Sequence, residues 1–368
     1  MLDKELGMRS LRGLWVGDCI GNSCQLYNIH DVLRALKGKL GDVHAWVGGN
    51  QFKYSDDTEE AIVLFNHLVS QQNFDPTEPI DLDKLAMEFA TRFMERDPDG
   101  ETFGYGLMTR KVLRDIYEGV PWAEANKTFR KQEGTSSHVD TLITSILDKK
   151  SWKETAKVVQ ATIVKETAES KNPERVGSCG NGAAMRVAPL GALLANHTAY
   201  ECARAASLSA LPTHDHPEGI AGAMAIAQAA WRVARRSKDP LGPDNYWQHI
   251  LSTTPQGEVY KGLMKASILD LNSQLGVAIQ ILGNGSHVTC QDTVPLCCWL
   301  VIRGLTIHNQ HEDDNAFEKT IEDTSACGGD VDTTAAIVGG IIGSVLNPPA
   351  DWVNLCVDME GVIENELV

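Results

Sequence analysis

Apolar residues recur every three to four positions along most of the chain, which is the spacing of one face of an α-helix. Pro217 and Glu218 open the clearest such segment, and Arg232 and Arg235 lie near its end, an order that suits the helix dipole. Alternating strand patterns are scarce, and residues 157–163 fit a strand or a helix equally well. The pattern predicts an all-α fold with helices over 57–71, 81–95, 108–117, 182–196, 217–236, 294–305 and 332–346.

The interruptions between these segments are short. They fall at residues 75–79, 97–100, 238–244 and 283–286. Short connections are typical of one compact unit, and the chain has no long Ser/Gly linker and no internal repeat. We therefore expect one compact domain over residues 1–368.

Composition limits the classes of partner. The formal net charge is -16, from 49 acidic and 33 basic residues. This balance argues against broad nucleic-acid binding, which relies on Lys and Arg to neutralise phosphates. The most apolar run, residues 335–346, is too short to span a membrane.

Cysteine usage bears on the compartment. The chain has nine cysteines, an odd number, and no pair is spaced as C-x-x-C. The first residues also lack the charged-then-apolar pattern of a signal peptide. We expect reduced thiols and a cytoplasmic location.

Two acidic clusters each precede an apolar helix. The first runs from Tyr54 to Glu60 (YSDDTEE), and the second, GGDVDTT, contains Asp330 and Asp332. Each has a simple alternative interpretation as a helix cap, because acids favour the first turn of a helix. Asp330 and Asp332 are two residues apart, so one helix face cannot hold both, although a loop can.

Taken together, the two clusters supply oxygen ligands for hard divalent cations. Six such side chains could hold two ions, and a two-metal centre can orient a substrate and activate water. The six are Ser55, Asp56, Asp57, Asp330, Asp332 and Thr333.

Three further motifs carry weaker signals. The glycine-rich loop 177–182 (GSCGNG) opens a helix and can present N–H groups to an anion, although a plain loop fits equally well and Cys179 lacks a clear catalytic partner. His214 and His216 have no third ligand at zinc spacing, which favours a capping turn or a substrate contact. Small residues from Gly13 to Gly21 predict close helix packing, with Asp18 as a hydrogen-bonded structural acid.

In this order the motifs resemble the ADP-ribosylglycohydrolase family, which includes the dinitrogenase reductase-activating glycohydrolases and some lens crystallins. The resemblance spans roughly Gly13 to Gly343. It is carried by GDCIG, YSDDTEEAI, FGYG, GSCGNGAAMRVAPLG, THDHPEG and GGDVDTTAAIVGGIIG.

The resemblance implies an all-α, single compact orthogonal helical bundle with two Mg²⁺ ions, or Mn²⁺, in a central metal-binding cleft. It assigns the metal ligands to Ser55, Asp56, Asp57, Asp330, Asp332 and Thr333, and the catalytic role to Asp57, Asp330 and Asp332. It places the substrate against Gly177, Ser178, Cys179, Gly180, Asn181, Gly182, His214, Tyr105 and Gln25.

This chain departs from the family pattern at two positions. Gln25 stands where a glutamate usually reaches the metal or the substrate, and a neutral amide cannot act as a base. Asp57 or another carboxylate would then handle the proton. Glu59 stands where Gln is common, and we expect it to face solvent.

The expected activity is hydrolysis of the bond that joins ADP-ribose to a protein or a small conjugate. One alternative is a binding or crystallin-like structural protein on the same fold, and a second is a phosphohydrolase that cuts the diphosphate. The leaving group stays open among arginine, serine, acetate and other conjugates.

Overall fold

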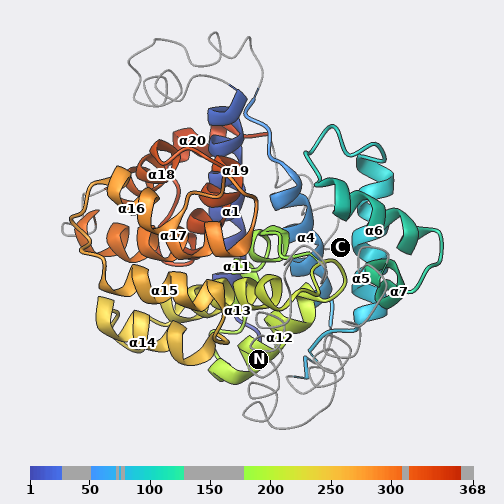
Figure 1. The fold of residues 1–368 in the computed structure, drawn as a ribbon, viewed down its shortest axis with the longest axis horizontal. Helices are drawn as coiled ribbons and strands as arrows, with labels where there is room; N and C mark the ends of the chain where they lie inside the picture. The colour runs from blue at the N-terminus through green and yellow to red at the C-terminus, as the bar shows by residue number, and fades with distance from the viewer. Residues whose placement is uncertain (27–50, 72–73, 76–78, 128–177, 309–314, 358–368) are drawn as a thin grey trace.

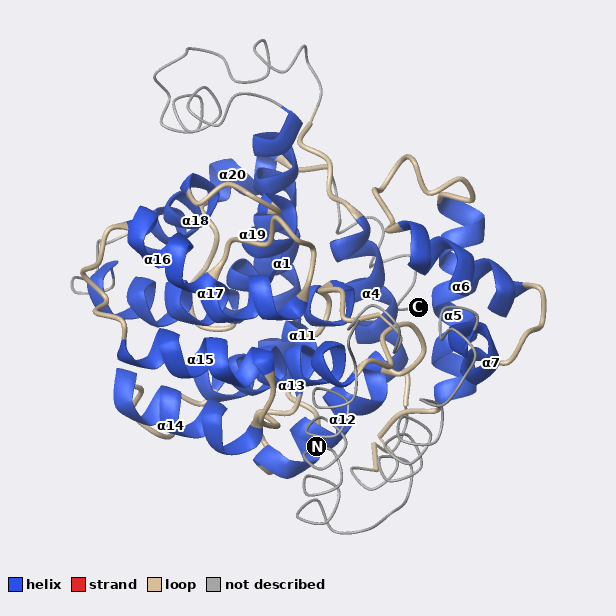
Figure 2. Cartoon of the chain, viewed as in Figure 1, coloured by secondary structure: helices blue, strands red, loops and turns tan. Residues whose placement is uncertain are grey.

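Helices dominate the structure. This computed structural model describes residues 1–26, 51–71, 74–75, 79–127, 178–308 and 315–357. In these residues, extended structure is limited to two isolated bridges, Phe52 with Cys356 and Gly180 with Thr289 (Figure 2). The all-α prediction is confirmed, and the segment 157–163 lies outside the described residues.

Each predicted helical segment contains helix. The matching elements are α4 (Asp56–Val69), α5 (Leu82–Arg96), α6 (Leu107–Tyr117), α10 (Gly182–Met185), α11 (Ala188–Leu193), α13 (Pro217–Ala234), α17 (Cys290–Arg303) and α19 (Val331–Gly343). The structure adds α1 (Lys4–Leu26), α7 (Trp122–Lys127), α12 (Ala199–Ala210), α14 (Pro243–Thr253), α15 (Glu258–Ile268), α16 (Leu275–Leu282), the π-helix η2 (Gly304–His308), α18 (Ala316–Ala326) and α20 (Ala350–Leu355).

The prediction of one helix over 182–196 was wrong, because the chain breaks between α10 and α11. Pro189 lies in the first turn of α11. Its ring occupies the space of the carbonyl four residues earlier, that of Met185, where α10 ends. Arg186 and Val187 lie in the break, and the Arg186 side chain is fully buried.

Helices α1 and α19 pack side by side near the middle of the molecule (Figure 1). Helices α5, α6 and α7 form a group on one side of this pair. Helices α14 to α18 form a larger group on the other side. The two acidic clusters, at the starts of α4 and α19, therefore lie between the two groups of helices.

Glycines in α1 permit this close approach. A Cβ atom on Gly17 would lie 2.1 Å from the carbonyl oxygen of Ala335, and one on Gly21 would lie 2.6 Å from the Cα of Asp332. Any larger residue would force the two helices apart. The predicted close packing is confirmed, and it holds Asp332 against α1.

Asp18 joins α1 to the start of α4. Its carboxylate accepts hydrogen bonds from the backbone N–H of Ser55 (2.9 Å) and Thr58 (3.1 Å). It also accepts from the hydroxyl groups of Ser55 (2.8 Å) and Thr58 (2.6 Å). Asp18 is fully buried, so these donors satisfy a charge that burial would otherwise disfavour. The prediction of a structural acid is confirmed.

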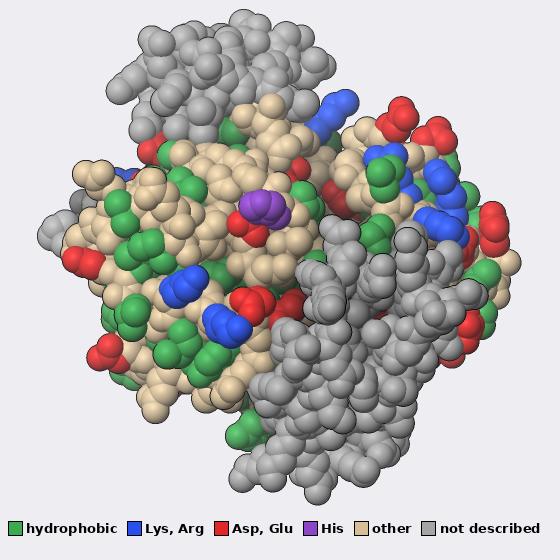
Figure 3. All heavy atoms as spheres, in the orientation of Figure 1, with side chains coloured by type: hydrophobic (Ala, Val, Ile, Leu, Met, Phe, Trp, Pro, Cys, Tyr) green, Lys and Arg blue, Asp and Glu red, His purple; other side chains and the backbone are tan. Residues whose placement is uncertain are grey.

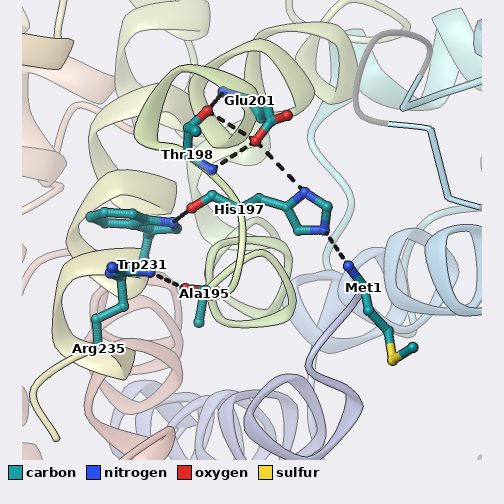
Figure 4. A network of polar contacts seen from close by, with 7 residues as sticks. All are labelled: Met1, Ala195, His197, Thr198, Glu201, Trp231 and Arg235. Carbon is teal, nitrogen blue, oxygen red and sulfur yellow. Dashed lines mark hydrogen bonds and ion pairs between the residues drawn. The ribbon is translucent and has the colours of Figure 1, made fainter. Parts of the chain in front are cut away.

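Side chains also fix the ends of the outer helices. At the start of α12, Thr198 Oγ1 accepts from the N–H of Glu201 (3.2 Å), whose carboxylate accepts from the N–H of Thr198 (2.7 Å) (Figure 4). Trp231 in α13 donates its indole N–H to the carbonyl of His197 at 3.1 Å. The first two bonds cap α12, and the third connects α13 to the residue that precedes this cap.

On the face in Figure 3, positive and negative side chains are both visible among the coloured residues. Among the residues drawn in colour there, Lys and Arg side chains over α5 to α7 lie among Asp and Glu side chains. In the described part of the chain, no helix combines the length and the apolarity needed to cross a membrane.

Candidate active site

The starts of α4 and α19 open onto one cavity of about 620 Å³. Asp56 and Asp57 line it from α4, and Asp330, Asp332 and Thr333 line it from the start of α19. The two clusters lie about 270 residues apart in the sequence, and the fold brings them together. Each helix directs the positive end of its dipole at the carboxylates.

Burial and mutual repulsion govern the charges of these acids. Burial raises the pKa of Asp56 and of Asp57 well above the usual value, and neighbouring carboxylates raise both further. Burial, with the charge of Asp332, raises the pKa of Asp330 to about 7, and burial also raises the pKa of Asp332. A cavity of this kind favours a bound positive charge, which would relieve the repulsion.

Polar side chains form hydrogen bonds with three of the acids. Asn181 donates its amide N–H to Asp330 Oδ2 at 2.7 Å, and Gln25 donates to Asp332 Oδ1. Ser55 Oγ lies 2.8 Å from Asp57 Oδ2. The other oxygen, Asp57 Oδ1, is buried and has no hydrogen-bond partner among the described residues. An acceptor left in that state is costly unless something in the cavity binds it.

The interpretation of the two clusters as simple helix caps holds for one and fails for the other. Ser55 is the N-cap of α4, since its hydroxyl accepts from the N–H of Asp57 at 3.2 Å. Asp330 occupies the N-cap position of α19, but its side chain makes no capping hydrogen bond. It accepts from Asn181 across the cavity instead.

The two glycines before α19 have positive φ angles, which glycine adopts readily. Gly328 and Gly329 have φ values of 62° and 78°, which L side chains rarely adopt. Asp332 lies in the first turn of the helix rather than in the loop, so the turn and the helix start together place both Asp330 and Asp332 on the cavity.

The donor set suits a hard divalent ion in its chemistry. It contains carboxylates and hydroxyls, and an unsatisfied oxygen, Asp57 Oδ1, faces no protein donor. No group of three or more His, Cys, Asp or Glu side chains in the described residues is arranged to hold a metal ion as it stands. The carboxylates of Asp330 and Asp332 contact amides, so both would have to turn toward a shared ion.

The glycine-rich loop faces the acids across the cavity and packs on His214. Ser178, Cys179, Gly180, Asn181 and Gly182 line the cavity, and Gly177 lies outside the described residues. A Cβ atom on Gly182 would lie 2.6 Å from Cε1 and 2.8 Å from Nε2 of the His214 ring. The absence of a side chain at Gly182 therefore leaves room for the imidazole ring of His214.

The two histidines of the His-x-His motif have separate roles. His214 lines the cavity. His216 is the N-cap of α13, where its Nδ1 accepts from the N–H of Glu218 at 3.0 Å. The prediction of a capping turn is confirmed. The nine cysteines all lie in described residues and form no disulfide, as the sequence predicted.

Sequence reasoning missed a buried polar network at the wall of the cavity. Glu60 lines the cavity and pairs with Arg186, whose Nη1 lies 2.6 Å from Glu60 Oε2. Arg186 also donates to the carbonyl of Ser209 and to Thr213 Oγ1, both at 2.9 Å. Glu60 lies four residues after Asp56, so helical periodicity could have placed it on the same face. Nothing in the local sequence identifies Arg186 as its partner.

Four positions differ from the prediction: Ser55, Gln25 and Tyr105 do not line the cavity, and Glu59 is buried. The expectation that Glu59 faces solvent was wrong, because its side chain is fully buried and pairs with Arg92 and with Arg96, whose Nε is 3.0 Å away. Tyr105 is buried against Phe93, with ring centroids 4.9 Å apart, and does not line the cavity. Its neighbours Gly104 and Gly106 do.

Comparison with known proteins identifies the family of the chain. The profile of the family described as ADP-ribosylglycohydrolase matches residues 3–367. The chain belongs to the ADP-ribosylglycohydrolase family. The match covers both acidic clusters, the glycine-rich loop and His214, so the cavity lies within the region that defines the family.

The similar proteins have low sequence identity to this chain but align with nearly all of it. It is 25% identical to human ADP-ribosylhydrolase ARH3 over 97% of this chain and 90% of that protein. It is 24% identical to an uncharacterized protein of Archaeoglobus fulgidus over 90% of this chain and 85% of that protein. A solved structure described as an ADP-ribosylglycohydrolase-related protein complex superposes with a TM-score of 0.52 at 17% identity, covering 99% of this chain and 96% of that one. That likeness concerns the fold alone.

Proposed function

We propose that this protein hydrolyses the bond between ADP-ribose and a modified side chain or small conjugate, and that it needs Mg²⁺ or Mn²⁺ to do so. The observation that carries the proposal is the meeting of four carboxylates, from two helix N-termini, opposite a glycine-rich loop in one cavity. Family membership and the relationship to ADP-ribosylhydrolase ARH3 support the same reaction class.

The proposed ion ligands are Ser55, Asp56, Asp57, Asp330, Asp332 and Thr333. When bound, divalent ions would supply positive charge to orient ribose hydroxyls and to lower the pKa of water. Ser55 is the least direct of the six, because its hydroxyl lies within 2.8 Å of both Asp18 and Asp57.

The protein's own groups would bind the ADP-ribosyl unit and move protons. The backbone N–H groups of the loop 178–182 can donate to the diphosphate. We assign to Asp57 Oδ1 the role of accepting a proton from the attacking water, because this atom is buried on the cavity and has no donor in the described protein.

Gln25 favours the second candidate function, a binding protein with reduced activity. Its amide donates to Asp332 and cannot take up a proton. A catalytic role does not require Gln25 to be a base if Asp57 is one. The two proposals therefore differ in a measurable way, since only the first predicts turnover.

The deciding experiment is an assay of ADP-ribose release from peptides modified on arginine or serine, and from the acetate ester. Each reaction is run with Mg²⁺, with Mn²⁺ and with EDTA. Metal-dependent release of ADP-ribose from any substrate supports the proposal. Tight ADP-ribose binding without turnover would favour the binding protein, and AMP as product would mean that the diphosphate is cut.

A further inference from the structure

A chain of hydrogen bonds runs through the core from Glu60 to His214, two residues that line the cavity from different elements. Arg186 lies at its centre, with Nη1 2.6 Å from Glu60 Oε2 and Nη2 2.9 Å from Thr213 Oγ1. Thr213 Oγ1 lies 2.8 Å from His214 Nδ1. Arg186 is completely buried, and its guanidinium lies over the Phe89 ring at 4.2 Å. The chain therefore has little freedom to rearrange.

The directions of these bonds determine where the His214 proton lies. A guanidinium can only donate, so Thr213 Oγ1 accepts from Arg186. The threonine hydroxyl has a single hydrogen, and Nδ1 of His214 is its partner in the described residues. Donation of this hydrogen to Nδ1 leaves no hydroxyl hydrogen unpaired in the core, and it places the proton of a neutral ring on Nε2.

The Nε2 edge of the ring faces the glycine-rich loop. A Cβ atom on Gly182 would lie 2.8 Å from Nε2, and one on Gly180 would lie 3.4 Å away. Both glycines line the cavity, as His214 does. Burial and the charge of Arg186 lower the pKa of His214 to about 3, so the ring is neutral at physiological pH.

We propose that Arg186 is a positioning residue that acts through Thr213 to hold His214 in the Nε2–H tautomer, as a hydrogen-bond donor to an oxygen of the bound ligand. The ligand group is a phosphate or ribose oxygen beside the glycine-rich loop. This identity rests on the proposed function, whereas the tautomer does not. A wrong tautomer would present a lone pair to that oxygen and repel it.

The tautomer can be read directly from the folded protein. In a protein labelled with ¹⁵N-histidine, two-bond ¹H–¹⁵N correlations distinguish Nε2–H from Nδ1–H rings. The chain has 11 histidines, so His214→Gln identifies the signal by its loss. We expect an Nε2–H pattern at pH 7, and an Nδ1–H pattern or a positively charged ring would overturn the proposal.

Thr213→Val removes the hydroxyl and leaves a side chain of the same shape, whereas Thr213→Ser restores the hydroxyl. We expect mixed tautomers in Thr213→Val, a dissociation constant for ADP-ribose about tenfold higher, and recovery of both in Thr213→Ser. Thr324→Val is the matched control, because Thr324 is also fully buried but donates to Thr320 in α18.

The outcomes separate cleanly. Unchanged tautomer and unchanged affinity in Thr213→Val would overturn the proposal, as would an equal loss of affinity in Thr324→Val. If Thr213→Val does not fold, the wild-type spectrum still decides the tautomer. If the wild type does not bind ADP-ribose at all, the proposed function fails, while the spectrum still tests the relay from Arg186.

Discussion

Glu60 and Arg186 form an ion pair in which Oε2 and Nη1 lie 2.6 Å apart and both side chains are buried. Within the part of the chain that the structure describes, the other oxygen, Glu60 Oε1, has no hydrogen-bond partner. A buried pair of this kind contributes little net stability when intact, but breaking it leaves an uncompensated charge in the core. The pair therefore makes the wall of the cavity sensitive to a single substitution.

Glu60→Gln should lower the free energy of unfolding by about 3 kcal/mol, because Arg186 loses its counter-charge. Urea denaturation followed by circular dichroism measures this loss. Glu59→Gln is the matched control, since Glu59 pairs with Arg92 and Arg96 but does not line the cavity. We expect weaker ADP-ribose binding in Glu60→Gln alone. Equal affinity in the two variants would contradict a role for Glu60 at the cavity.

The contrast between these two glutamates shows how far the sequence could be read. Periodicity predicted the helix over 57–71, and the acids at its start marked the end of the helix that lines the cavity. The burial of Glu59 was not readable, because its ion partners come from a separate helix, α5. Arg186, the partner of Glu60, lies 126 residues away in the chain. It lies in the break between α10 and α11, where periodicity predicted one continuous helix. Local pattern therefore identified acids that line the cavity but not the buried charges beside them.

Asp332→Asn should remove most activity and leave the protein folded. Burial raises the pKa of Asp332, and its charge raises the pKa of Asp56, Asp57 and Asp330, so the amide removes repulsion that opposes folding. Without metal, the variant should melt at or above the wild-type temperature, and it should gain less from added Mg²⁺. Melting curves with and without Mg²⁺ test this, with Asp115→Asn, at a half-buried residue of α6 that does not line the cavity, as control. Wild-type activity together with a wild-type Mg²⁺ response would remove Asp332 from the metal site.

Gly182→Ala should weaken ADP-ribose binding by at least tenfold, because the new methyl group would overlap the His214 ring at 2.6 Å. Isothermal titration measures the change. Gly276→Ala in α16 is the matched control, since a Cβ atom there meets nothing within 4 Å. The control should gain about 0.5–1 kcal/mol of stability from helix propensity and bind normally. Normal binding by Gly182→Ala would mean that His214 can move without consequence.

His249 should make the protein less stable in mild acid. Burial, with the charges of Arg232 and Arg235, lowers the pKa of His249 to about 4, below the value of about 6.5 for an unfolded chain. The unfolded state thus binds more protons between these pH values, and stability falls as the pH drops from 6.5 to 4. In His249→Gln this loss should shrink by roughly 2 kcal/mol. Urea titrations at pH 7 and pH 4 measure it, and His287→Gln, at an exposed side chain, should leave the difference unchanged.

Gln25→Glu tests whether the neutral amide limits activity. In the wild type Gln25 donates to Asp332, and a glutamate there would repel it and add one more carboxylate to the site. Without metal, the variant should lose up to about 1 kcal/mol of stability, and it should gain more than the wild type from Mg²⁺. If proton transfer or metal affinity limits turnover, ADP-ribose release should rise in Gln25→Glu, whereas Gln25→Ala should not raise it. Should Gln25→Glu show the larger Mg²⁺ response with no rise in turnover, the position tunes metal binding, and the proton must be handled elsewhere, as we propose for Asp57. A variant with neither effect would show that the contact between Gln25 and Asp332 has no bearing on the metal site.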